Sequence, residues 1–188
     1  AGLWVKSPDI DAVSRLASDV QSQGFTGKNV VLGRNTLSPV NTQNTSMIME
    51  AGAAYYYILM GNVAQNLRID RFGDIWSGYF LQKCLSGGDL CVRVGNPVVD
   101  HIRNRHNLLH DLKDEMAGIL ITEELVPLVQ KLNLVGETIA DRYGDLARKL
   151  AAAIQDTDSP VFSEEVKKYF GKITGIMKIW ADISKVLL

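Results

Sequence analysis

Arg71-Phe72-Gly73-Asp74-Ile75-Trp76-Ser77-Gly78-Tyr79 marks the start of a helix in the middle of the chain. Gly73 breaks the preceding segment, and Asp74 can cap or open the helix that we expect over residues 74–85. An acid at a helix N-terminus, with Arg71 just before it and aromatic side chains behind it, suits a polar ligand such as a sugar or a phosphate. The alternative interpretation is an ordinary helix cap whose Trp76 faces the core.

The composition is that of a globular protein with a real core. The chain has 188 residues, of which 46% are hydrophobic and 22% charged, and this fits one domain or a domain with an appendage. A formal net charge of −1 gives no electrostatic case for nucleic acid or an anionic membrane as partner. The longest apolar run, Met47 to Met60, contains Glu50, so we expect no membrane span.

The two cysteines, Cys84 and Cys91, flank a turn that contains Gly87, Gly88 and Asp89. A disulfide across this turn is geometrically feasible, but two thiols in an otherwise unstapled chain favour a reducing cytoplasm. They lack the spacing and the partners of a zinc site. No signal-peptide pattern is visible, and a start without Met inside a strand-like run suggests a truncated or processed product.

The first half of the chain mixes short strands with helices. We expect strands at residues 2–5, 29–32 and 90–94 and helices at residues 10–20, 51–60 and 74–85. Residues 35–44 are rich in turn formers and predict a loop, and residues 45–49 predict a strand or a core segment.

Helical periodicity dominates from His106 onward. We expect a helix over residues 108–120 that is interrupted near Gly118, and further helices over residues 122–132, 139–154 and 162–187. The last of these has one broad apolar face. The sequence therefore predicts an α/β portion at residues 1–105 and a helical tail at residues 106–188 that packs on it.

Two Asp-x-Asp triplets have the spacing that can hold Mg²⁺ or Mn²⁺ on a nucleotide diphosphate. Asp9-Ile10-Asp11 stands at a proline-led helix start, where the helix dipole favours aspartate in any case. Asp156-Thr157-Asp158 lies in a linker. We therefore favour a structural role for both triplets.

The three histidines lie close together in the sequence. His106 and His110 would share a helical face as zinc ligands do, but no third ligand is evident and a structural role is favoured. His101 ends the strand-like segment 97–100, and such loops often carry site residues. The amide-rich loop 41–45 suits recognition of sugar hydroxyls, although polar loops are common. No serine-hydrolase elbow and no glycine-rich phosphate loop is present in the sequence.

Taken in order, several short motifs resemble the reversibly glycosylated polypeptide family, the UDP-arabinopyranose mutases. The motifs are Gly2-Leu3-Trp4 with Pro8-Asp9-Ile10-Asp11-Ala12, Pro39 with Asn44, Arg71 to Gly78, Pro97 to His101, Glu123-Glu124 with Pro127, and Tyr169-Phe170 with Trp180. They cover most of the chain. The resemblance implies the C-terminal part of a glycosyltransferase-A-like mixed sheet, with a helical C-terminal tail behind a portion on the sugar and acceptor side.

The resemblance also implies roles for individual residues. Asp74 would lie at the sugar or acceptor end of a pocket as a base or an orienting carboxylate. His101 would approach a divalent metal, Mn²⁺ or Mg²⁺. The residues implied to bind the substrate are Trp4, Asp9, Asp11, Asn44 and Arg71, and the aromatic face of the opening segment adds Trp76. Gly73 departs from the family, since it replaces the first aspartate of a pair.

Three hypotheses about function follow. The leading one is the C-terminal part of a nucleotide-sugar mutase or glycosyltransferase-like protein; in that family a UDP-activated pentose changes between pyranose and furanose forms, with a divalent metal on the diphosphate. The family's acidic metal-binding triplet, its self-glycosylated arginine and its nucleotide-binding portion would lie upstream of Ala1, so we expect no activity from this chain alone. The second is a non-catalytic module that pairs with an intact homologue or another subunit, as a homo- or hetero-oligomer. The third is a metalloprotein that uses His106 and His110.

Overall fold

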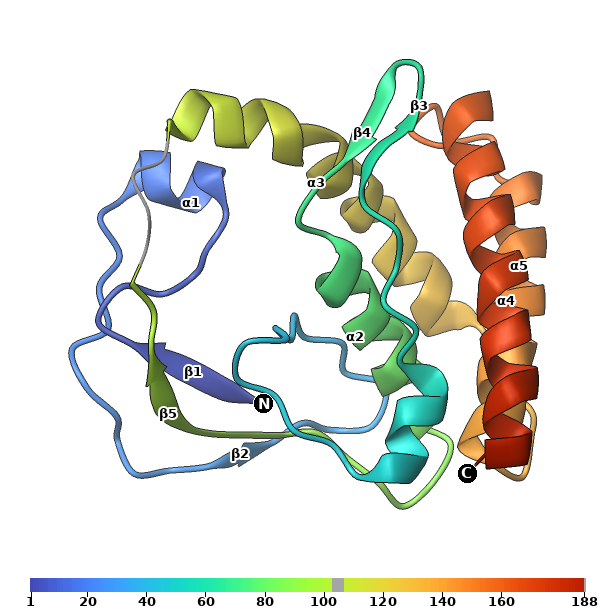
Figure 1. Cartoon of the computed structure of the whole chain (residues 1–188), viewed down its shortest axis with the longest axis horizontal. Coiled ribbons are helices and arrows are strands. Elements are labelled where there is room, and N and C mark those ends of the chain that lie inside the picture. Colours follow the sequence, from blue (N-terminus) through green and yellow to red (C-terminus); the bar gives the residue numbers. More distant parts are fainter. Residues whose placement is uncertain (103–106, 188) are drawn as a thin grey trace.

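A small mixed sheet stands beside a larger helical body in the computed structural model, which describes residues 1–102 and 107–187 (Figure 1). The sheet has the order β1-β5-β2, in which β1 (Gly2–Val5) runs parallel to β5 (Arg93–Asp100) and β2 (Val30–Val31) runs antiparallel to it. A short helix, α1 (Ala12–Ala17), follows β1. The predicted fold class, α/β with a helical C-terminal region, is confirmed.

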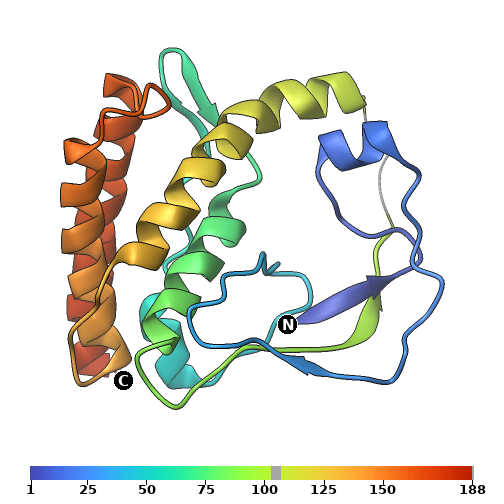
Figure 2. The same cartoon turned by 180° about the vertical axis from the view of Figure 1, so that it is seen from behind.

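The helical body contains four long helices. They are α2 (Gly73–Leu85), α3 (Leu108–Lys131), α4 (Ile139–Asp156) and α5 (Glu164–Leu187). A 3₁₀ helix, η1 (Met49–Ala54), and a two-stranded hairpin of β3 (Gly61–Ala64) and β4 (Leu67–Ile69) lie beside them. Both views show α4 and α5 lying side by side along the edge of the molecule away from the sheet (Figure 2).

The α4–α5 pair follows directly from the sequence pattern. Thr138 and Asp141 form a reciprocal cap at the start of α4, which satisfies donors that a helix end leaves open. Apolar residues at helical spacing then face α5 from α4, and those of α5 return the contact. The buried residues on the two faces include Tyr143, Leu146, Leu150 and Ile154 on α4 and Val166, Phe170, Ile173 and Met177 on α5.

Trp76 lies at the centre of the core and is 0% exposed. Its ring packs against those of Phe72, Tyr169 and Phe170, with centroids 5.5, 6.4 and 5.4 Å away. Its Nε1–H donates to Thr122 Oγ1 at 2.8 Å, and an unpaired buried donor there would cost about 1–3 kcal/mol. The segment at residues 71–79 therefore joins α2 to both α3 and α5.

The predicted interruption near Gly118 is wrong, because α3 runs through this residue without a break. A Cβ atom at position 118 would lie 2.1 Å from Cδ2 of Phe72. The glycine makes room for that aromatic ring instead of ending the helix.

Other predicted elements differ in length. Residues 45–48 form no strand. Of the helix expected over residues 51–60, only residues 51–54 are helical, as part of η1, and residues 55–60 form no helix. The helix expected over residues 10–20 spans Ala12–Ala17 only, since Val13 and Leu16 are 47% and 48% exposed and have no core to cover. The strand expected at residues 90–94 begins at Arg93 and continues to Asp100. The β3–β4 hairpin was not predicted.

The structure also bears on the predictions about the cysteines, the domain division and a membrane span. Cys84 and Cys91 are both free thiols, so the disulfide across their turn is not formed. One hydrophobic cluster includes residues from η1 to α5. The predicted division between residues 1–105 and 106–188 falls at residues outside the described part of the chain and stays a prediction. Within the described ranges, no helix has the length and apolar character that crossing a membrane requires.

Candidate functional site

A cavity of about 330 Å³ opens where β1, the segment before α2 and the first half of α3 approach one another. Its lining includes Trp4, Asp9, Asp11, Tyr57, Asp70, Arg71, Asp74 and Glu115. Four of the predicted substrate-binding residues and the predicted catalytic Asp74 therefore meet in one place, although they come from positions 4 to 74 of the sequence. We call this space the Asp74 cavity.

Asp74 is the second residue of α2, because the helix begins at Gly73 and Phe72 occupies the N-cap position. Asp74 therefore opens the helix and does not cap it. Its Oδ2 accepts a hydrogen bond from the Thr42 N–H at 3.3 Å, and its Oδ1 accepts one from the Ile75 N–H at 3.0 Å. Burial raises the pKa of Asp74, and the negative charge of Asp9 adds to this effect against the opposing N–H donors.

Two tyrosines that sequence reasoning overlooked lie within electrostatic reach of Asp74. Burial raises the pKa of Tyr57, and the charge of Asp74 adds to it. The pKa of Tyr55 is raised by burial, by the charge of Asp74 and by the neighbouring Tyr57. Tyr57 lines the Asp74 cavity, so its phenol stays protonated and can donate a hydrogen bond there.

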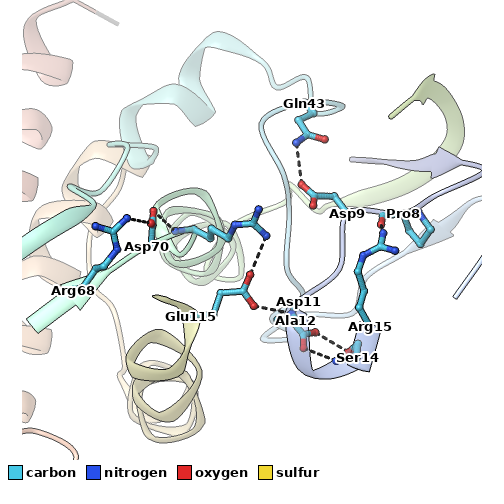
Figure 3. A network of polar contacts seen from close by, with 11 residues as sticks. Pro8, Asp9, Asp11, Ala12, Ser14, Arg15, Gln43, Arg68, Asp70 and Glu115 are labelled. Carbon is cyan, nitrogen blue, oxygen red and sulfur yellow. Dashed lines mark hydrogen bonds and ion pairs between the residues drawn. The ribbon is translucent and has the colours of Figure 1, made fainter. Parts of the chain in front are cut away.

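Gln43 connects two of the predicted residues across the cavity wall. Its Oε1 accepts the Trp4 Nε1–H at 2.7 Å, and its Nε2 donates to Asp9 Oδ2 at 3.0 Å, the second of which Figure 3 shows. The amide-rich loop therefore orders the indole and the carboxylate.

Asp11 caps α1, as the structural interpretation of the first triplet predicts. Its Oδ1 accepts the Ser14 N–H at 2.9 Å, and its Oδ2 accepts the Ser14 hydroxyl at 2.7 Å. Both oxygens are engaged within α1, so the main role of this carboxylate is to fix the helix start beside the cavity.

Arg71 adopts the left-handed backbone conformation, with φ of 64°, which is uncommon for a residue other than glycine. Its Nη1 donates to Oε1 of Glu115 at 2.9 Å. Glu115 Oε2 accepts the Ala12 N–H at 2.7 Å, and through this bond the carboxylate reaches the start of α1 (Figure 3). Sequence reasoning missed Glu115. A glutamate three residues before Gly118 and six before Ile121, on the buried face of α3, was the available signal.

Trp76 and Asn44 lie outside the Asp74 cavity. The assignment of Trp76 to substrate binding needs correction, because its ring is fully buried and its N–H is bonded to Thr122. The alternative interpretation, a tryptophan facing the core, is confirmed. Asn44 binds the edge of β1 through its Nδ2, which donates to the Leu3 carbonyl at 2.9 Å. It lines a separate cavity of about 720 Å³ between the sheet and α2.

The described residues do not fit a resident divalent metal. Across residues 1–102 and 107–187, no group of three or more His, Cys, Asp or Glu side chains could hold an ion. His101 follows β5 and is not part of the lining of the Asp74 cavity. Its role as a metal ligand stays a prediction. His106 lies outside the described residues, so the predicted pairing of His106 with His110 as metal ligands stays a prediction.

The sequence matches one protein family and is similar to several plant proteins. The sequence model of the family described as "Reversibly glycosylated polypeptide" matches residues 1–185. UDP-arabinopyranose mutase 1 of Arabidopsis thaliana is 26% identical over 185 residues, which are 96% of this chain and 48% of that protein. UDP-arabinopyranose mutase 3 of the same plant is 27% identical over 187 residues, 97% of this chain and 49% of that protein. UDP-arabinopyranose mutase 1 of Oryza sativa subsp. japonica is 25% identical over 185 residues, 96% of this chain and 47% of that protein. The chain spans about half the length of the curated relatives it matches.

Proposed function

The chain belongs to the reversibly glycosylated polypeptide family, and we propose that its Asp74 cavity binds the pentose of a nucleotide sugar. The relatives carry the name UDP-arabinopyranose mutase. The proposal for this chain is that it forms the sugar-binding part of such a mutase, which interconverts the pyranose and furanose forms of a UDP-pentose.

The charge of the cavity lining is the observation that carries the proposal. Five carboxylates, those of Asp9, Asp11, Asp70, Asp74 and Glu115, line it, and Arg71 is the one cation among the described lining residues. This excess of negative charge opposes a diphosphate, whereas carboxylates readily accept hydrogen bonds from hydroxyl groups. A neutral sugar therefore fits the cavity better than a nucleotide does.

The size and the aromatic lining of the cavity agree with a small sugar. Its volume of about 330 Å³ lies at the lower end of the range for small-molecule pockets. Trp4 and Tyr57 offer apolar surface for the C–H groups of a sugar ring, and both also carry a polar group. The nucleotide would then extend out of the Asp74 cavity.

Asp74 is the residue we propose for proton transfer. A change of ring size breaks the ring bond to one sugar oxygen and forms it to another, so the attacking hydroxyl must lose its proton and the released ring oxygen must gain one. The raised pKa makes the Asp74 carboxylate a better base than an exposed aspartate. The N–H groups of Thr42 and Ile75 fix its orientation, and the protonated Tyr57 can donate to a sugar oxygen. A divalent metal on the diphosphate is what the family resemblance implies, but the described residues offer no group of three or more His, Cys, Asp or Glu side chains for it.

The test is a titration of the 188-residue chain, followed by NMR of its backbone amides. UDP-arabinopyranose is expected to shift the signals of Thr42, Asp74 and Ile75, whereas UDP alone is not. Asp74→Asn should weaken binding by about tenfold or more, since a hydrogen bond to a charged group contributes about 1.5–3 kcal/mol. Asn29→Ala, in the lining of the larger cavity, is the control and should bind as the wild type does. Tight binding of UDP alone with shifts at Asp74, or no binding of UDP-arabinopyranose at millimolar concentration, would contradict the proposal.

A second candidate function is a non-catalytic module that pairs with a homologue or another subunit. Exposed apolar residues near the end of α5 favour it, since Ile179, Ile183 and Val186 are 59%, 45% and 85% exposed. Light scattering at several concentrations, alone and with a full-length mutase, tests this candidate. A monomer that stays monomeric under all these conditions would contradict it.

A further inference from the structure

Glu115 is a buried carboxylate in the wall of the Asp74 cavity, and it is 2% exposed. A charge removed from water is destabilising by several kcal/mol unless it is paired and hydrogen-bonded. Both oxygens of Glu115 are engaged, one by the Arg71 guanidinium at 2.9 Å and one by the Ala12 N–H at 2.7 Å. This one side chain therefore joins α3, the segment before α2 and the start of α1.

The contact with Arg71 fixes a residue that would otherwise be free to reorient. The Arg71 side chain is 36% exposed, and its left-handed backbone is a conformation that persists only where the surroundings impose it. A guanidinium carries five N–H donors. Among residues 1–102 and 107–187, Glu115 is the one side-chain partner of the Arg71 guanidinium. Within those ranges its guanidinium makes no other hydrogen bond, and since Arg71 lines the cavity, its remaining N–H groups are candidate donors for a ligand there.

A bound sugar needs these donors. Each hydroxyl group donates one hydrogen bond and accepts others, and ionised carboxylates can only accept. Carboxylates of the lining such as Asp74 can accept hydrogen bonds from the hydroxyl groups, while the hydroxyl oxygens depend on N–H and O–H donors such as those of Arg71. The direction of the Arg71 guanidinium would thus decide how the sugar lies.

We propose that Glu115 is a positioning residue of the Asp74 cavity, which holds Arg71 so that its free N–H donors face the hydroxyl oxygens of the bound sugar. The inference rests on the proposed function for its ligand. Its contact with Ala12 at the same time keeps the Asp9–Asp11 segment against the cavity. Glu115 acts through other residues and does not itself touch the sugar.

The test is a double-mutant cycle with Glu115→Gln, Arg71→Met and the double variant, titrated with UDP-arabinopyranose. Each single variant should lose about tenfold or more in affinity, and the double variant should lose no more than Arg71→Met does alone. Glu124→Gln, the same change at an exposed position of α3, is the matched control and should bind normally. Additive losses in the double variant would overturn the inference while the proposed function stands.

A ligand-free measurement separates positioning from the proposed function. In the wild type the Arg71 Nε–H should give a sharp NMR signal with the relaxation of an ordered group. In Glu115→Gln that signal should show fast local motion, while the chain stays folded by circular dichroism. If UDP-arabinopyranose does not bind the wild type, the proposed function fails, and this measurement still decides the role of Glu115. An Arg71 signal that is equally ordered in both proteins would overturn it.

Discussion

Gly118→Ala should destabilise the protein, although helix propensity by itself predicts that this substitution is stabilising. In the interior of an ordinary helix, replacing glycine by alanine stabilises by about 0.8–1 kcal/mol. At position 118 the new Cβ would lie 2.1 Å from the Phe72 ring, where ordinary contact begins at 3.4 Å. Overpacking destabilises a core by about 1–3 kcal/mol, and an overlap as deep as 2.1 Å calls for the upper part of that range, about 2–3 kcal/mol. The net expectation is a loss of about 1–2 kcal/mol in the free energy of unfolding.

Gly175→Ala is the matched control, because Gly175 lies inside α5 with nothing within 4 Å of its added Cβ. It should gain about 0.8–1 kcal/mol, so the two variants should differ by about 2–3 kcal/mol. For a chain of this size that corresponds to melting temperatures about 5–10 °C apart. Urea unfolding followed by circular dichroism at 222 nm measures the difference. If Gly118→Ala were as stabilising as Gly175→Ala, the packing of Phe72 on α3 would not be the reason for the glycine.

Two further substitutions test the start of α2. Gly73→Asp, which restores the acid of the family's pair, should lower the free energy of unfolding by about 1–3 kcal/mol, because a Cβ at this position would lie 2.8 Å from the Ile58 carbonyl oxygen. Gly171→Asp is the control, since it lies in open space on α5 and should change the urea midpoint far less. Burial raises the pKa of Asp74, so the folded state holds this proton to higher pH than the unfolded chain, and stability is lost as pH rises from the unfolded pKa of about 3.9 towards the folded value. Urea titrations should therefore show a higher free energy of unfolding for Asp74→Asn than for the wild type at pH 7, and equal values near pH 4. A lower value for the variant at pH 7 would show that the N–H donors stabilise the charged carboxylate by more than burial destabilises it.

The long helices could be predicted because their apolar residues recur at the period of the helix itself. The periodicity gave α4 and α5 nearly to their ends, and glycine and acid placement gave the start of α2 to within one residue. The same reasoning failed where an apolar pattern has no partner to cover, as at Val13 and Leu16, or where a glycine serves packing, as at Gly118. A local sequence pattern does not indicate which other segment of the chain packs against a residue.

The candidate site divides in the same way. Trp4, Asp9, Asp11, Arg71 and Asp74 could be selected from residue type, order and resemblance, and they meet in one cavity. Glu115 could not be selected so readily, since a glutamate in a helix is ordinary until its burial and its two partners are known.

The sequence by itself determined the α/β class, the family and the group of acids and aromatic residues around the start of α2. Only the tertiary structure decided which aromatic is core and which lines the cavity, since Trp4 and Trp76 differ in burial and not in chemistry. It also decided that a buried carboxylate of α3 holds Arg71. The physical reason is that helix and strand periods are local properties of the chain, whereas burial and pairing depend on segments that the chain brings together from far apart.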